Sequence, residues 1–100
     1  MTRHRIVYLR KARQDLLNIL RYIQKDSPQD ARAWVDSIER ALGRLARFPL
    51  SGAVPKDDRL AALGYRVVVA GEYLAFYLIR RNRVEIRRVL HGRRRYGFLL

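Results

Sequence analysis

The sequence contains no cysteine, so neither a disulfide framework nor a thiolate metal site can form. Its two histidines, His4 and His91, have no carboxylates at a usable ligand spacing, and we expect no metal and no other cofactor. No apolar stretch approaches the roughly 18 residues that a membrane span needs, and the N-terminus lacks the apolar run of a signal peptide. We therefore expect a soluble, cytoplasmic protein that has no membrane partner.

Acidic residues are also scarce, with 9 against 22 basic residues and a net charge of +13. Nearly all the cations are arginines, since the only lysines are Lys11, Lys25 and Lys56. A dense positive field attracts polyanions, whether nucleic acid, an acidic protein or an anionic membrane surface. The preference for arginine favours planar, bidentate recognition of phosphate or carboxylate.

No segment is rich in proline, glycine or serine, which argues against a linker or a disordered tail. With 100 residues, of which 49% are hydrophobic, the chain is long enough for one core and too short for two. We expect a single domain over residues 1–100.

The first half of the sequence predicts one strand and two helices. Residues 5–9 (RIVYL) have strand character, and apolar residues then recur at spacings of three and four over residues 11–25. A second amphipathic helix is predicted from Pro28 to about Arg47, with Ser27 as its cap. Because the connection is short, the helices should form an antiparallel hairpin.

From Gly64 onward the hydrophobic period changes to two. Residues 64–70, 72–80 and 83–90 resemble strands separated by short turns, which predicts a three-stranded antiparallel meander. The middle strand is apolar on both sides and should be central. These elements predict an α+β fold, with both helices on one face of the sheet and the opposite face partly open.

The last strand breaks its alternation at Arg88, where an apolar residue is due. Either a bulge shifts the register, or Arg88 points into a half-buried pocket that contains a partner. We favour the pocket.

Short patterns run in a fixed order through most of the chain. They are A..DL..I..YI (Ala12, Asp15, Leu16, Ile19, Tyr22, Ile23), P..A (Pro28, Ala31), L...P..G (Leu45, Pro49, Gly52), GYR (Gly64 to Arg66), YLAFYLI in the middle strand and VEIRRVLHGRR at the end. In this order and spacing they resemble the RelE/ParE superfamily of toxins from bacterial type II toxin–antitoxin systems. The ending, RVLHG followed by arginines, is similar to the ParE branch.

The resemblance implies a RelE/ParE-like toxin, from modules linked to plasmid stabilization, that causes growth arrest when its antitoxin is degraded. ParE-like members poison DNA gyrase without nuclease chemistry, whereas RelE-like members cut messenger RNA in the ribosome. The resemblance also implies a hetero-oligomer with a cognate antitoxin, whose acidic, amphipathic C-terminal segment folds onto the toxin. We expect a gyrase inhibitor that is not an enzyme, with the ribosome-dependent mRNA endonuclease as the alternative.

For that alternative, the residues of a metal-independent ribonuclease would have to bind phosphate and move protons. The candidates are His91, Tyr96, Arg66, Arg88, Arg93 and Arg94. No second acid or base is evident, because Glu72 belongs to a hairpin and Glu85 lies roughly 20 Å from His91 along the strand. We therefore interpret His91 as closing the last strand and Tyr96 as a packing residue.

For the gyrase inhibitor, arginines of the last two strands and the tail should bind the target or a partner. This set comprises Arg80, Arg81, Arg83, Arg87, Arg93, Arg94, Arg95 and Tyr96. The aromatic residues Trp34, Tyr73 and Tyr77 are candidates to border the antitoxin groove, although such residues also suit a sheet core.

A plain nucleic-acid-binding module is a hypothesis of a different class. The charge predicts salt-sensitive, non-specific binding of DNA or RNA whatever the true role. However, the sequence has no helix-turn-helix, zinc-finger or RNA-recognition signature.

Overall fold

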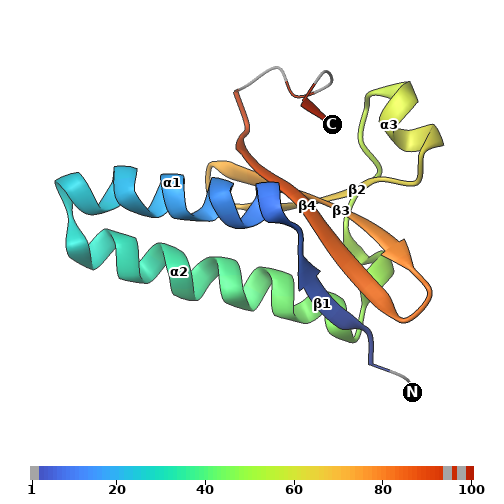
Figure 1. Ribbon diagram of the computed structural model, residues 1–100, viewed down its shortest axis with the longest axis horizontal. Helices are drawn as coiled ribbons and strands as arrows, with labels where there is room; N and C mark the ends of the chain where they lie inside the picture. The colour runs from blue at the N-terminus through green and yellow to red at the C-terminus, as the bar shows by residue number, and fades with distance from the viewer. Residues whose placement is uncertain (1–2, 94–95, 97–98) are drawn as a thin grey trace.

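A four-stranded sheet, in the order β1-β4-β3-β2, packs against a hairpin of two long helices (Figure 1). The computed structural model describes residues 3–93, 96, 99 and 100. The strands are β1 (Arg5–Tyr8), β2 (Arg66–Ala70), β3 (Tyr73–Arg80) and β4 (Arg83–His91), and the helices are α1 (Arg10–Asp26), α2 (Pro28–Gly43) and the short α3 (Asp58–Ala62). Among the described residues, no helix is both long and apolar enough to cross a bilayer.

The helix hairpin forms where its sequence signals predict it. The backbone N–H of Asp30 donates to the Ser27 hydroxyl at 3.1 Å, and Pro28 occupies the first turn of α2. The α-helix ends at Gly43, earlier than predicted, because glycine disfavours a helix interior. A 3₁₀ helix (Arg44–Ala46) continues the turn, and a second one covers Pro49–Ser51.

The predicted meander is confirmed, with β3 hydrogen-bonded antiparallel to both β2 and β4. The sequence did not place the first strand. It lies parallel to β4, with Arg5 opposite Arg83 and Tyr8 opposite Ile86, so that β4 is also an interior strand. The first and last strands are therefore neighbours in one sheet, and the helix hairpin follows β1 in the chain before the meander (Figure 1).

The side of the sheet opposite the helices differs from the prediction. It was expected to be partly open, but it carries a second apolar cluster. The cluster consists of Leu60, Tyr65, Phe76, Leu78 and Leu90, with Val67, Leu74, Tyr96, Leu99 and Leu100 packed against them. Its cover comes from α3 and from Tyr96, Leu99 and Leu100 near the C-terminus, and both segments are too short to show a hydrophobic period in the sequence.

The main core lies between the sheet and the helices, and Tyr77 is its largest fully buried side chain. The Tyr77 hydroxyl donates to the Pro49 carbonyl at 2.6 Å and accepts from the Gly52 N–H at 3.0 Å. A Cβ at position 52 would collide with this ring, so glycine is required there. Burial raises the pKa of Tyr77 above its usual value of 10.0. Tyr77 thus ties the segment after α2 to the middle strand.

We expect Tyr77→Phe to lower the free energy of unfolding by about 1–3 kcal/mol, because it leaves a buried N–H and a carbonyl without their partner. Tyr65→Phe is the matched control. Tyr65 is also buried, at 6% exposed, but no described residue hydrogen-bonds its hydroxyl. Urea denaturation followed by circular dichroism measures both. Equal losses in the two variants would contradict the assigned role of the Tyr77 hydroxyl.

Candidate functional site

Arg88, a candidate for phosphate binding, is engaged inside the fold. Its Nε and Nη2 donate to the two carboxylate oxygens of Asp15 on α1, at 2.8 and 3.0 Å. Both side chains are mostly buried, at 14% and 13% exposed. Asp15 also accepts the backbone N–H of Val89 at 2.9 Å, and Arg88 Nη1 donates to the Leu99 carbonyl at 3.2 Å. The hydrogen bond with Asp15 raises the pKa of Arg88, which supports a structural role for this arginine.

Both alternatives considered for Arg88, a bulge in β4 and a half-buried pocket with a partner, are present. The β3–β4 register shifts between Phe76 and Tyr77, because Tyr77 faces Ile86 while Phe76 faces Arg88, which leaves Arg87 as the extra residue. The bulge re-aims the Arg88 side chain, and its partner comes from a helix 73 residues earlier. Nothing in the sequence links Arg88 to Asp15, which occupies an ordinary polar position of an amphipathic helix.

His91 closes β4 on the side of the helices. Its ring packs edge-on against Tyr73, with centroids 5.4 Å apart, and Tyr73 in turn contacts Trp34 at 5.6 Å. His91 Nδ1 accepts the backbone N–H of Arg93 at 3.1 Å. Backbone and aromatic contacts therefore hold the imidazole at the end of the strand.

Glu72 is a residue that the sequence interpretation wrongly set apart from His91. Strand pairing places Tyr73 opposite His91, and this brings the Glu72 carboxylate to 3.8 Å from His91 Nε2. The Glu72 side chain is 79% exposed, so solvent screens the contact. The sequence could have revealed this pair only if the β3–β4 hairpin had been aligned with Tyr73 opposite His91, because that alignment places Glu72 next to the end of β4.

The remaining catalytic candidates do not gather around His91. Tyr96 packs on Phe76 with ring centroids 4.8 Å apart, in the second apolar cluster. Since Tyr73 and Phe76 lie on opposite faces of β3, His91 and Tyr96 are separated by the sheet. Arg66, on the outer strand β2, donates to the carbonyls of Gly52 at 2.8 Å and Leu50 at 3.2 Å. Arg94 and Arg95 lie outside the described residues.

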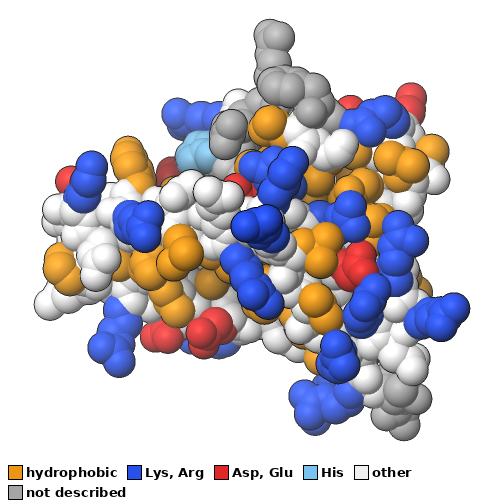
Figure 2. Space-filling view, in the orientation of Figure 1, with side chains coloured by type: hydrophobic (Ala, Val, Ile, Leu, Met, Phe, Trp, Pro, Cys, Tyr) orange, Lys and Arg blue, Asp and Glu red, His pale blue; other side chains and the backbone are white. Residues whose placement is uncertain are grey.

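A buried carboxylate organises the arginines around β4. Glu85 is only 6% exposed and faces the side opposite the helices. Its oxygens lie 2.5 Å from Arg83 Nη2, 3.2 Å from Arg87 Nη1 and 3.6 Å from Arg80 Nε. Figure 2 shows the blue side chains that gather over β1 and β4, with an acidic side chain among them. One carboxylate among three guanidinium groups leaves this surface positive and holds the arginines in place.

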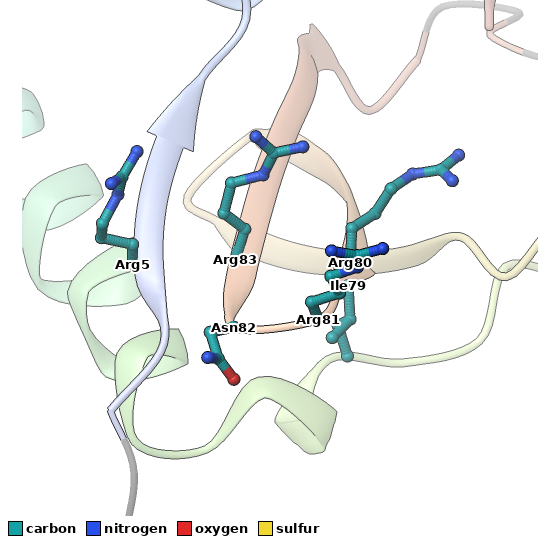
Figure 3. Close-up of a pocket in the computed structure, with 6 residues that line it drawn as sticks. All are labelled: Arg5, Ile79, Arg80, Arg81, Asn82 and Arg83. Atoms are coloured by element: carbon teal, nitrogen blue, oxygen red, sulfur yellow. The ribbon is translucent and has the colours of Figure 1, made fainter.

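The turn between β3 and β4 carries a hollow of about 680 Å³ (Figure 3). It is lined by Arg5, Ile79, Arg80, Arg81, Asn82 and Arg83. Arg81 has a φ of +57°, a left-handed conformation that costs a non-glycine residue about 1 kcal/mol or more. The arginine-rich surface therefore extends from β4 to the hairpin tip.

A second hollow of about 300 Å³ lies on the helix hairpin. Its lining is mostly apolar and consists of Tyr8, Leu16, Leu17, Leu20, Trp34, Val35 and Ile38, with Arg13 and Glu39. Of the residues predicted for an antitoxin groove, Trp34 lies here and Tyr73 contacts the Trp34 ring. Tyr77 is fully buried, so its placement in a surface groove was wrong: its hydroxyl is used inside the core.

A family model and a curated relative both describe toxins. Residues 6–96 match the family described as ParE toxin of type II toxin-antitoxin system, parDE. The chain is 33% identical to "Putative toxin Y4kP" of Sinorhizobium fredii over 100 residues, the whole of both chains.

Two solved structures share the fold. A chain of the chromosomal ParDE TA system from P. aeruginosa superposes with a TM-score of 0.71 at 21% identity, covering 88% of this chain and 95% of that one. A chain of the toxin–antitoxin complex RelBE2 from Mycobacterium tuberculosis superposes with a TM-score of 0.61 at 31% identity, covering 91% and 93%. The predicted α+β fold is confirmed by these neighbours.

We expect Asp15→Ala to lower the free energy of unfolding by about 2–4 kcal/mol, because Arg88 and the Val89 N–H would lose their shared acceptor. Asp36→Ala is the control, since Asp36 is an exposed acid on α2 and the change in helix propensity is the same. Chemical denaturation compares the two variants. A loss no larger than that of Asp36→Ala would show that Asp15 does not hold α1 to β4.

Proposed function

Because the chain belongs to the ParE toxin family of type II toxin–antitoxin systems, we propose that it arrests growth by binding DNA gyrase, and that it does so without catalysis. The observation that carries this proposal is the separation of His91 from Tyr96 by the sheet. The two groups able to move protons at the end of the chain therefore face different surroundings.

Cleavage of RNA would need these groups at one phosphate. A general base and a general acid act within hydrogen-bond reach of the atoms that react, about 2.6–3.2 Å. His91 packs on Tyr73 and Tyr96 on Phe76, while Arg88 is already engaged with Asp15. Binding to a protein target requires no such convergence, only a surface with complementary shape and charge.

The segment from Arg87 to Tyr96 supplies that surface in our proposal. Arg87 is partly exposed and oriented by Glu85, and Arg93 is exposed two residues after His91. Arg94 and Arg95 continue the run of positive charge in the sequence. These arginines would meet acidic side chains of gyrase in the cytoplasm, where salt and competing charge set the association rate.

A cognate antitoxin would neutralise the toxin by covering the helix hairpin. The apolar hollow beside Trp34 offers sites for the apolar anchors of an amphipathic segment, and Leu17 at its border is 52% exposed. A net charge of +13 favours an acidic partner. Both solved relatives come from toxin–antitoxin systems, which supports a cognate antitoxin as a partner of this chain.

The ribosome-dependent mRNA endonuclease remains the second candidate, and one contact favours it. Glu72 lies 3.8 Å from His91 Nε2, so the histidine has a carboxylate neighbour of the kind that can orient a general base. The 31% identity to a chain of the RelBE2 complex is consistent with this alternative.

The two candidates differ in their need for His91 and Tyr96. If the chain is a gyrase inhibitor, His91→Gln and Tyr96→Phe should each leave toxicity within about twofold of the unchanged protein, because both changes keep most of the side-chain volume and leave the arginines that bind the target unchanged. Loss of a general acid or base in a nuclease would instead lower the rate by about 10²–10⁴. Controlled expression in a bacterium, with DNA damage response, plasmid topology and messenger cleavage followed in one culture, measures the difference. Codon-positioned messenger cleavage that His91→Gln abolishes would overturn the gyrase proposal.

Charge reversal tests the surface itself. We expect replacement of Arg93, Arg94 and Arg95 by Glu to weaken inhibition of purified gyrase by about tenfold or more, since like charges would then face the target. The matched control reverses three exposed helix residues, Arg21, Arg32 and Arg40. A supercoiling assay with purified gyrase compares the two. If tail reversal leaves inhibition intact, or if both triple variants lose it equally, the C-terminal segment is not the target-binding surface.

A further inference from the structure

The hollow at the β3–β4 turn gathers cations from two distant parts of the chain. Arg5 comes from the edge strand β1, and Arg83 lies directly opposite it on β4 (Figure 3). Arg80 and Arg81 come from the end of β3 and the turn. Parallel pairing of β1 with β4 thus places an N-terminal arginine beside the hairpin.

The charges in this hollow are only partly balanced. Glu85 contacts Arg83 and Arg80, so these two guanidinium groups have an internal counterion. Within the part of the chain that the structure describes, no carboxylate lies within 4.0 Å of Arg5 or Arg81. Clustered like charges repel one another, and an anion that enters the hollow would relieve this repulsion.

The backbone conformation of the turn indicates a functional role for the arginine at its tip. Arg81 and Asn82 are the two central residues between the paired residues Arg80 and Arg83. Arg81 adopts the left-handed φ of +57°, a position that glycine or asparagine takes with less strain. Asn82 occupies the next position, yet it is Arg81 that adopts the strained conformation. Strain of this kind concentrates at binding sites.

We propose that this hollow binds phosphate groups of a DNA backbone. Several forked guanidinium groups suit phosphate oxygens, and contacts of this type position a protein on DNA without reading its sequence. An acidic, amphipathic peptide fits less well, because Ile79 is the sole apolar residue in the lining, whereas the apolar hollow beside Trp34 offers several anchors.

This inference extends the proposed function, because gyrase holds a DNA duplex and a toxin bound to the enzyme would meet phosphates. Arg5 and Arg81 would then contact DNA while the C-terminal segment contacts protein. The hollow would add affinity for gyrase that carries DNA over gyrase alone.

The test measures the salt dependence of DNA binding by the full chain. Arg5→Gln combined with Arg81→Asn removes two charges from the hollow, and asparagine relaxes the strained turn, so the variant should fold at least as stably. Arg21→Gln combined with Arg32→Gln removes two exposed helix charges as the control. Fluorescence anisotropy with a short labelled DNA duplex gives the slope of log K against log salt. Each lost phosphate contact reduces this slope by about 0.9, so the hollow variant should lose about 1.8 and the control almost nothing.

The same titration with poly-L-glutamate identifies the class of ligand. Selective loss of DNA binding in the hollow variant supports the proposal. Equal losses in the hollow and control variants overturn it, because the binding would then reflect general charge. Loss of polyglutamate binding with unchanged DNA binding also overturns it, in favour of an acidic protein partner.

A supercoiling assay separates this site from the proposed function. A wild-type chain that fails to inhibit gyrase, while the hollow variant selectively loses DNA binding, would support the phosphate site and refute the gyrase target. If the wild-type chain inhibits gyrase and the hollow variant binds DNA as the wild type does, the gyrase target is supported and the phosphate site is refuted.

Discussion

The position of α1 on the sheet depends on the carboxylate of Asp15. The edge strand β1 ends at Tyr8. The backbone hydrogen bonds between this segment and β4 end one residue later, where the Leu9 N–H donates to the Ile86 carbonyl. Beyond it, Asp15 replaces a strand by accepting bonds from Arg88 and the Val89 N–H. A mostly buried ion pair is stable only when its remaining hydrogen-bond groups are satisfied, and here the Leu99 carbonyl takes another Arg88 donor.

The chemistry at the end of the chain follows from this arrangement. The bulge at Arg87 lets Arg88 turn toward Asp15 and restores the alternation of β4, so that Val89 returns to the main core and Leu90 to the second cluster. His91 is then directed to Tyr73 on the side of the helices, while Tyr96 packs on Phe76 on the opposite side of the sheet. The bulge that lets Arg88 pair with Asp15 thus also places His91 on the face of the sheet opposite Tyr96.

The sequence predicts structure that depends on neighbouring residues better than contacts between segments far apart in the chain. Hydrophobic periodicity and the Ser27–Pro28 signal were enough for the helix hairpin, the meander and the two apolar faces of β3, because each depends on residues close in the chain. The parallel pairing of β1 with β4 and the Asp15–Arg88 pair depend on register between distant segments, and the Glu72–His91 contact depends on the exact register of the β3–β4 hairpin, which the bulge sets. Tyr77 shows the same limit: its aromatic ring suited a groove as well as a core, and only the positions of Pro49 and Gly52 decide between them.

Charge is distributed over the molecule in a way that self-repulsion alone does not explain. A net charge of +13 destabilises a compact chain, and carboxylates placed evenly would reduce that cost. Instead, the two least exposed ones in the ion pairs, Asp15 and Glu85, pair with arginines of β3 and β4 close to the sheet. Glu85 offsets only part of the charge of the three arginines around it, and no carboxylate of a described residue lies within 4.0 Å of Arg5 or Arg81. The positive surface therefore has a counterion where it meets the sheet and excess positive charge where it meets solvent, an arrangement suited to polyanionic partners.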